Sequence, residues 1–219
     1  MKKMNIIYED KDLLVVEKES NVLTISSPKE HEHTLYHEAS TYVKKQFPKN
    51  KIFIVHRLDK DTSGLVIFSK NQAKKIELQN NWENVKRSYY AIVEGKMPKE
   101  KGIMKSYLAE DKTLRVYSTS NPRIGKLAIT EYEVLNYSNN FTLLRINIKT
   151  GRKNQIRVQL SDINHPIVGD KKYGSKYNPI RRLLLHAYLI DINSKDKCYH
   201  FETPYPKSFS QIIKKWYNK

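Results

Sequence analysis

A dense group of charged and polar side chains occupies residues 55–65, between two apolar segments that read as strands. A loop held between strands can present side chains for chemistry while its ends stay fixed. Asp59 stands out because its neighbours Arg57 and Lys60 stabilise the ionised carboxylate, which can then act as a nucleophile or a base. The run that begins at Asp59 is also typical of a turn, in which Asp and Ser bind backbone amides and Gly takes a positive φ. Taken alone, the segment favours the turn.

A second group lies in residues 150–170 and includes an arginine at helical spacing from apolar residues. On a helix, three apolar side chains would form the buried stripe: Ile156, Leu160 and Ile163. Arg157 shares the neighbouring face with Asn154 and Ser161, at the edge of the core. An arginine in that position needs a carboxylate partner, which could be Asp59 or an acid elsewhere on the surface.

A third candidate is Tyr89, in a segment that alternates so that Tyr89, Ala91 and Val93 share one strand face. A tyrosine there could stack on a nucleic-acid base, an interaction worth about 1–3 kcal/mol. The chain has 15 tyrosines, however, and most tyrosines simply pack.

The spacing of His31, His33 and His37 could suggest a metal site, but no fourth ligand supports it, so a solvated surface segment is favoured.

The elements that must position these residues mix strands and helices. Strands are expected at 12–18, 52–55, 65–68 and 88–94, and helices at 35–47, 71–82 and the C-terminus, where Ser208 and Gln211 have capping-box spacing. Strands at 130–137 and 141–148 bracket Asn139 and Asn140, which tolerate the left-handed backbone of a hairpin turn. This pattern predicts an α+β fold with a mixed, mostly antiparallel sheet flanked by helices.

The composition indicates a nucleic-acid partner. The 219 residues contain 40 Lys+Arg against 23 Asp+Glu, a net charge of +17, together with 6 Phe and 2 Trp. A folded, aromatic-rich protein with this charge is expected to bind a polyanion, and RNA fits better than a membrane because no apolar run is long enough to span one. The single cysteine, Cys198, excludes an internal disulfide and is consistent with the cytoplasm.

The candidate segments, in this order, resemble the RluA family of pseudouridine synthases. The matching strings cover nearly the whole chain: His56 to Asp59 with Thr62 to Leu65, Tyr89 to Gly95, Gly151 to Val158, His165 to Asp170, Leu183 to Ala187, and Thr203 to Pro206. Two positions depart from the family pattern, which usually has histidine where this chain has Asn154 and often where it has Gln159. The early Lys-Pro-x-Gly pattern is replaced by a segment that ends in Asn21, a residue that still tolerates positive φ.

The resemblance implies that uridines in RNA are isomerised to pseudouridine, without a cofactor or a metal. The glycosidic bond breaks, the uracil turns, and a carbon–carbon bond to the same ribose forms. Asp59 would be the catalytic carboxylate that attacks or deprotonates the sugar. Asp61 matches a variable position and receives no role.

The resemblance also implies substrate-binding roles for four residues. Arg157 would pair with Asp59, Tyr89 would stack on the uracil, and Leu185 would form part of the apolar floor. Arg57 would enter the gap that the flipped base leaves, where a flat cation can replace a stacked ring.

The chain as a whole is expected to be one catalytic domain, residues 1–219, without an N-terminal RNA-binding domain, and a monomer. Ribosomal or transfer RNA stem-loops are the expected substrates, because looped bases cost less to flip. A non-catalytic RNA-binding protein on the same fold is the alternative, and it would not need Asp59. A glycoside or nucleoside hydrolase would usually show two carboxylates and would not need the charge of +17.

Overall fold

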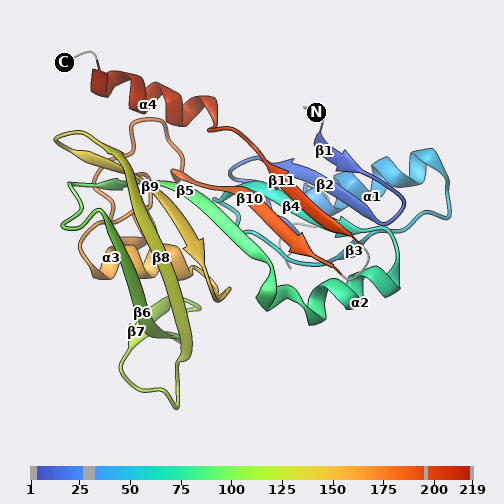
Figure 1. Ribbon diagram of the computed structural model, residues 1–219, viewed down its shortest axis with the longest axis horizontal. Coiled ribbons are helices and arrows are strands. Elements are labelled where there is room, and N and C mark those ends of the chain that lie inside the picture. The colour runs from blue at the N-terminus through green and yellow to red at the C-terminus, as the bar shows by residue number, and fades with distance from the viewer. Residues whose placement is uncertain (1–3, 27–32, 195–196, 218–219) are drawn as a thin grey trace. The chain divides into compact units, whose positions relative to one another are not determined.

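The computed structural model describes residues 4–26, 33–194 and 197–217. The chain forms two compact units, each made of two stretches of sequence. Unit 1 comprises Met1–Val85 and Leu189–Thr203, and unit 2 comprises Lys86–Tyr188 and Pro204–Lys219. Strand β10 (Leu185–Asn193) contributes residues to both units (Figure 1).

Unit 1 is built from short antiparallel strands and two helices. Its elements are β1 (Asn5–Glu9), β2 (Leu13–Lys18), α1 (Leu35–Gln46), β3 (Phe53–Ile54), β4 (Ser63–Ser69), α2 (Gln72–Asn80), a 3-10 turn η1 (Trp82–Asn84), and β11 (Cys198–Glu202). β2 pairs with β1 and with β4, β3 pairs with β4, and β11 pairs with β10, all antiparallel. Every residue of β4 is buried, so this strand is the centre of the unit.

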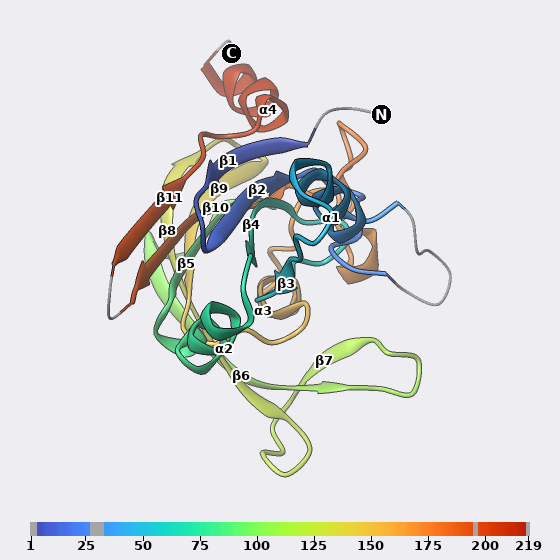
Figure 2. The ribbon, with the colours of Figure 1, turned by 90° about the vertical axis from the view of Figure 1, so that its right-hand side faces the viewer.

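Helix α1 confirms most of the predicted apolar face. Leu35, Ala39 and Val43 are buried, and the Thr34 side chain caps the helix by accepting the amide N–H of His37. Phe47, predicted to share this face, is 55% exposed because the backbone is already extended there. The helix lies beside the strands (Figure 2), where the Tyr42 hydroxyl donates to Glu9 and its first turn contacts β4 through an aromatic pair.

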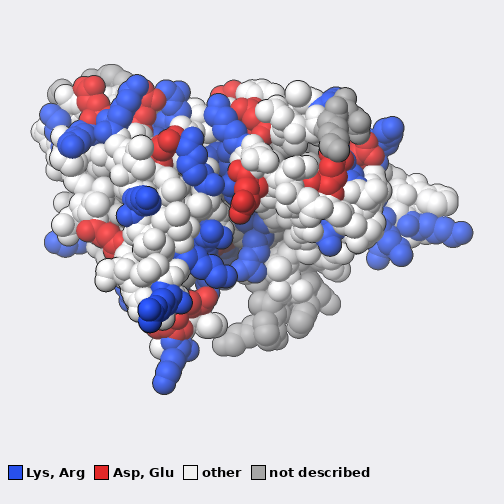
Figure 3. Space-filling view, turned by 60° about the horizontal axis from the view of Figure 1, so that its bottom comes forward, with Lys and Arg blue, Asp and Glu red and all other residues white. Residues whose placement is uncertain are grey.

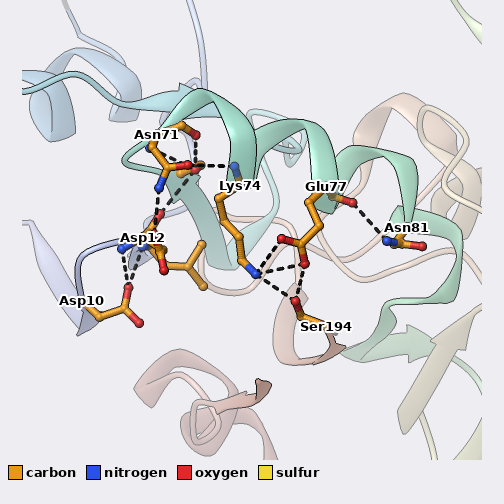
Figure 4. A network of polar contacts seen from close by, with 9 residues as sticks. Asp10, Asp12, Asn71, Lys74, Glu77, Asn81 and Ser194 are labelled. Carbon is orange, nitrogen blue, oxygen red and sulfur yellow. Dashed lines mark hydrogen bonds and ion pairs between the residues drawn. The ribbon is translucent and has the colours of Figure 1, made fainter. Parts of the chain in front are cut away.

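Helix α2 is anchored at both ends by polar contacts (Figure 4). Asn71 caps it by accepting the Lys74 amide N–H and donates its own side-chain N–H to Asp12. The Lys74 ammonium, which is buried, donates to both oxygens of Glu77 and to the hydroxyl of Ser194 at the end of β10. The helix ends sooner than predicted, at Asn80, and the Asn81 side chain donates to the Glu77 carbonyl at this end. Trp82, the last residue of the predicted helix, begins η1 instead.

Unit 2 contains an antiparallel sheet in the order β5-β9-β8-β6-β7. Its elements are β5 (Lys86–Glu94), β6 (Lys101–Glu110), β7 (Val116–Thr119), β8 (Lys126–Tyr137), β9 (Phe141–Ile148), α3 (Gln155–Asp162), a 3-10 turn η2 (Lys171–Tyr173), and α4 (Lys207–Tyr217). The strand pairs described within the units are all antiparallel, and the predicted α+β class is confirmed.

The predicted hairpin of β8 and β9 is present, but its turn works differently from the prediction. Ser138 closes it: the Ser138 amide donates to the Phe141 carbonyl at 2.8 Å, and the Ser138 hydroxyl oxygen accepts the Phe141 N–H. Neither Asn139 nor Asn140 takes a positive φ. The turn is therefore stabilised by a serine side chain, and not by asparagines in the left-handed conformation as predicted.

Each helix of unit 2 differs from its prediction at one position near a helix end. In α3 Ile156 and Leu160 are buried as predicted, but the helix ends at Asp162 and Ile163 is 37% exposed. Helix α4 begins at Lys207, so Ser208 lies inside the first turn, where its hydroxyl accepts a hydrogen bond from Arg182 instead of capping the helix. Phe209, by contrast, is fully buried in the core of the unit.

Among the described residues, no helix combines the length and apolar character that crossing a bilayer requires. The same residues contain no group of three or more metal-ligating side chains. Of the three histidines considered for a metal site, His33 and His37 are exposed, and His31 lies outside the described residues.

Candidate active site

The loop between β3 and β4 carries the first candidate residues. Val55 and Leu58 are buried and anchor it to the core of unit 1, whereas Arg57 is exposed and Asp59 is half-buried. The loop turns directly after Asp59, whose carbonyl accepts the Thr62 N–H at 3.1 Å. The segment therefore forms the turn that the sequence predicts and also carries exposed charge.

A buried lysine holds this loop. The Lys18 side chain is completely inaccessible, and its ammonium donates to the backbone carbonyls of Glu19, Val22 and Lys60 at 2.7–2.9 Å. Burying an ammonium is costly unless its protons are bound, and the three carbonyls bind them. Lys18 thus ties the end of β2 to the residue that follows Asp59.

Two further side chains from the segment after β2 hold the same loop. The Thr24 hydroxyl donates to the Leu58 carbonyl at 2.8 Å and accepts the Leu58 N–H at 3.2 Å, and the Ser20 hydroxyl donates to the Asp61 carbonyl at 2.6 Å. Asn21 stands where the family pattern has glycine. It adopts φ +68°, the left-handed conformation that was expected of it at this position. The loop is therefore restrained on both sides of Asp59.

His56 has a structural role in this unit. Its imidazole stacks on Trp82 with ring centroids 4.5 Å apart, and its Nε2 accepts the Ile67 N–H at 3.1 Å. Because Nε2 accepts, the ring proton belongs on Nδ1. The histidine of the His-Arg-Leu-Asp string thus fastens the start of the loop to β4.

In unit 2, Tyr89 and Leu185 belong to one apolar cluster. Tyr89 is half-buried and packs against the core that contains Leu185, Ala91 and Val93, all of them buried. The next residue, Tyr90, makes further ring contacts: it stacks on Tyr188 with ring centroids 3.7 Å apart, and its ring is tilted against that of Tyr205 at 4.2 Å. Neighbouring residues on a strand point to opposite faces, which separates the two tyrosines.

Arg157 makes a two-pronged ion pair with Asp170. Its Nε donates to Asp170 Oδ2 at 2.7 Å and its Nη2 donates to Asp170 Oδ1 at 2.8 Å. The two side chains are 6% and 0% exposed, so this contact is buried, unlike the surface pair that the sequence left open. Sequence reasoning missed Asp170 as a partner, although it lies in the quoted string that ends His-Pro-Ile-Val-Gly-Asp.

The positions that depart from the family pattern are both buried and bonded. Asn154 contacts Arg157 and Tyr173. Gln159 accepts the Thr130 hydroxyl proton at 2.7 Å and donates to Ser106 and to the Ala128 carbonyl, which binds α3 to the sheet. Amides thus fill both positions with their hydrogen-bonding groups engaged.

The five predicted site residues divide between the units. Unit 1 holds Arg57 and Asp59, and unit 2 holds Tyr89, Arg157 and Leu185. The predicted pairing of Arg157 with Asp59 stays a prediction.

Positive charge is widespread on the surface: the face in Figure 3 carries many lysine and arginine side chains with fewer acidic ones between them.

Comparison with known proteins gives a consistent result. Residues 12–162 match the family model described as RNA pseudouridylate synthase, a stretch that includes Asp59, Tyr89 and Arg157 but not Leu185. The chain is 34% identical over 223 residues to the ribosomal large subunit pseudouridine synthase D of Borreliella burgdorferi, covering 97% of this chain and 68% of that protein. It is also 34% identical over 218 residues to the uncharacterized RNA pseudouridine synthase YlyB of Bacillus subtilis, covering 96% and 72%.

The fold comparison agrees with the sequence comparison. The solved structure of human RNA pseudouridylate synthase domain containing 4 superposes with a TM-score of 0.82 at 20% identity, covering 95% of this chain and 91% of that one. The chain spans between 56% and 73% of the length of eight relatives that its sequence matches. The chain therefore belongs to the RluA family of RNA pseudouridine synthases, which are isomerases that act on RNA.

Proposed function

We propose that this chain converts uridines of ribosomal or transfer RNA to pseudouridine, with Asp59 as the catalytic carboxylate. The match of residues 12–162 to the family carries this proposal, because that stretch contains Asp59 in its His-Arg-Leu-Asp loop. The name of the relative from Borreliella burgdorferi, a ribosomal large subunit enzyme, favours ribosomal RNA over transfer RNA.

The reaction needs no net oxidant and no added group. The bond between C1′ of the ribose and N1 of uracil breaks, and a bond between C1′ and C5 forms. The proton on C5 leaves and N1 takes one up, so the product is an isomer of the substrate. Asp59 would begin the reaction by attacking the sugar or by removing a proton from it.

The substrate-binding roles follow the resemblance residue by residue. Arg57, exposed beside Asp59, would occupy the gap left by the flipped base, and Tyr89 would stack on the uracil. Arg157 and Leu185 belong to unit 2. As the resemblance implies, Arg157 would pair with Asp59, and Leu185 would form part of the apolar floor under the uracil. We further propose that the whole chain acts as one catalytic domain, as a monomer in the cytoplasm, with lysines supplying most phosphate contacts.

Release of tritium from RNA labelled at C5 of uracil tests the proposal, because C5 loses its hydrogen only when the new bond forms. We expect release by the wild-type chain and none by Asp59→Asn, with Asp61→Asn as the matched control that retains activity. Equal release by wild type and Asp59→Asn would exclude Asp59 as the catalytic group. RNA binding without any release, over a full set of cellular RNAs, would favour the non-catalytic alternative.

The target is identified by mapping pseudouridines in total RNA from cells with and without the gene. We expect a modified uridine in large-subunit ribosomal RNA to disappear with the gene and to return with the wild-type gene, but not with Asp59→Asn. If the only modification lost is in transfer RNA, the substrate is transfer RNA and not ribosomal RNA.

A further inference from the structure

The segment that joins α1 to β3 concentrates positive charge. The sequence contains no acidic residue at positions 39–58, and four lysines stand close together there: Lys44, Lys45, Lys49 and Lys51. All four side chains are exposed. In the part of the chain that the structure describes, none of the four pairs with an acidic side chain.

The end of helix α1 explains only part of this charge. Cations in the last turn of a helix complement the partial negative charge at its C-terminus, which accounts for Lys44 and Lys45. Lys49 and Lys51 lie beyond the helix. An acidic side chain that contacts α1, Glu9, already binds three other groups. The four lysines are therefore complementary to an anion from outside the segment.

An exposed aromatic ring stands among these lysines. Phe47 is 55% exposed, whereas a side chain of this size is usually buried. Pro48 explains why Phe47 leaves the apolar face of α1, because a residue that precedes proline is driven out of the helical conformation. Phe47 accordingly has φ −155° and ψ 128°, and the helix ends there.

The backbone that carries Phe47 is held on both sides. The Phe47 N–H donates to the Val43 carbonyl at 3.2 Å, and the Phe47 carbonyl accepts the Asn50 N–H at 2.9 Å. The Asn50 side chain donates to the same Val43 carbonyl at 3.1 Å. A ring on a fixed backbone loses less entropy when it binds a partner, so the segment is organised for binding in advance.

An exposed ring among unpaired lysines matches the chemistry of an RNA strand. The ring can stack on a base while the lysines contact the phosphates on either side. In a duplex the neighbouring bases cover both faces of each base, so a stacking ring favours an unpaired strand. We propose that Phe47 and the four lysines form a surface that binds a single-stranded segment of RNA.

This surface lies away from Asp59 within unit 1. β3 begins at Phe53, which pairs with Ser69 at the end of β4, whereas the loop that carries Asp59 leads into the start of β4 at Ser63. The length of β4, at about 3.3 Å per residue, puts about 20 Å between the two ends. The surface therefore contacts RNA that flanks the modified uridine and not the uridine itself, a placement that rests on the proposed function.

Binding of a fluorescein-labelled oligo(A) tests the stacking, because this strand has exposed bases and contains no uridine to react. We expect the dissociation constant to rise about 10-fold in Phe47→Leu and less than about 2-fold in Phe47→Tyr, which keeps the face of the ring. The matched control is Ile76→Ala, which removes another exposed apolar side chain of unit 1 and should bind like the wild type. No binding of oligo(A) by the wild type, or equal dissociation constants for the wild type and Phe47→Leu, would overturn the proposal.

Salt dependence tests the lysines separately from the ring. Each phosphate contact on a single strand contributes roughly 0.7 to the slope of log Kd against log salt. We expect the slope to fall by at least roughly 0.7 when Lys49→Gln and Lys51→Gln are combined, and to stay the same in Phe47→Leu, because stacking releases no counterions. Lys11→Gln, at an exposed position between two acidic residues, is the control. A slope that is the same in the double variant and in this control would overturn the role of the lysines.

An anionic membrane is the other partner that lysines and an exposed phenylalanine could bind. Vesicles of phosphatidylcholine and phosphatidylserine distinguish the two, because leucine enters a bilayer about as well as phenylalanine but has no ring to stack on a base. Vesicle binding that is stronger than oligo(A) binding and is unchanged in Phe47→Leu would overturn the assignment to RNA. Oligo(A) binding that is stronger than vesicle binding and falls in Phe47→Leu would support it.

The tritium assay separates this inference from the proposed function. If the wild type releases no tritium but its oligo(A) affinity depends on Phe47, the proposed function fails and the RNA-binding surface is supported. If the wild type releases tritium and its oligo(A) affinity does not depend on Phe47, the proposed function stands and the surface is overturned.

Discussion

The ammonium of Lys18 donates a 2.9 Å hydrogen bond to the carbonyl oxygen of Lys60, the residue that follows Asp59. The same ammonium binds two carbonyls next to its own strand, so one buried cation joins two segments 42 residues apart. The shape of the loop that carries Asp59 therefore depends on a side chain outside that loop.

Replacing this cation should destabilise the loop and the unit. Lys18→Met keeps most of the volume but leaves three carbonyls without this donor, so we expect the free energy of unfolding to fall by about 3 kcal/mol or more. Urea denaturation measures it, and the exposed Lys11→Met is the control, with a change below about 0.5 kcal/mol. Equal stability of Lys18→Met and wild type would show that water replaces the ammonium without cost.

Two glycines near Asp170 should respond differently to the same substitution. Gly169 and Gly174 both have positive φ, +85° and +90°. A Cβ on Gly169 would lie 2.0 Å from the Arg182 carbonyl oxygen, whereas a Cβ on Gly174 would meet nothing within 4 Å. We expect Gly174→Ala to cost about 1–2 kcal/mol, from the left-handed backbone alone. Gly169→Ala should cost clearly more in the same thermal or urea unfolding assay, and equal losses would contradict the close packing.

His186 should make unit 2 less stable in acid. Burial, and secondarily the Arg182 charge, lower its pKa from 6.5 to about 3. The unfolded chain takes up a proton below about pH 6.5 and the folded chain does not, so stability present above that pH is lost as the pH falls towards 3. Urea titrations from pH 7.5 to 4 should show this decline, and His186→Gln should flatten it, whereas the exposed His37→Gln should not.

His200 is expected to titrate in the opposite direction. The hydrogen bond with Asp191 is the main reason that its pKa is raised above 6.5. Its contribution to stability is complete below pH 6.5 and is lost as the pH rises through the raised value. Because the side chain is 62% exposed, the contribution should be about 0.5 kcal/mol or less. NMR titration of the imidazole should show a raised midpoint that drops in Asp191→Asn; an unchanged midpoint would rule out the contact as its cause.

The helices and strands could be predicted because each depends mainly on the pattern of residues within its own segment. β2, β4, β5 and the β8–β9 hairpin follow runs of β-branched and aromatic residues, and α1 follows its apolar spacing. Errors fell where an element ended: Phe47 and Ile163 continue the apolar spacing one residue beyond their helices and are exposed. Periodicity identifies the face of a helix but does not locate its last turn.

The contacts that hold the candidate site could not be predicted because they join distant residues. Lysine is rarely buried, so Lys18 gave no sign of its role. Arg157 was expected to need a carboxylate, but nothing in the spacing selects Asp170 among the 23 acidic residues. The roles of Asp59, Arg57, Tyr89 and Leu185 came from the family's motifs and stay predictions.

The stacking of Trp82 on His56 supplies an optical reporter. The chain has two tryptophans, and the other, Trp216, lies in α4. Replacing Trp216 with phenylalanine would leave one tryptophan, which can be excited selectively above the tyrosine absorption and whose ring is in contact with His56, the first residue of the His-Arg-Leu-Asp string. Emission from that single indole would follow movements of the loop in real time as RNA is mixed in, without any attached dye.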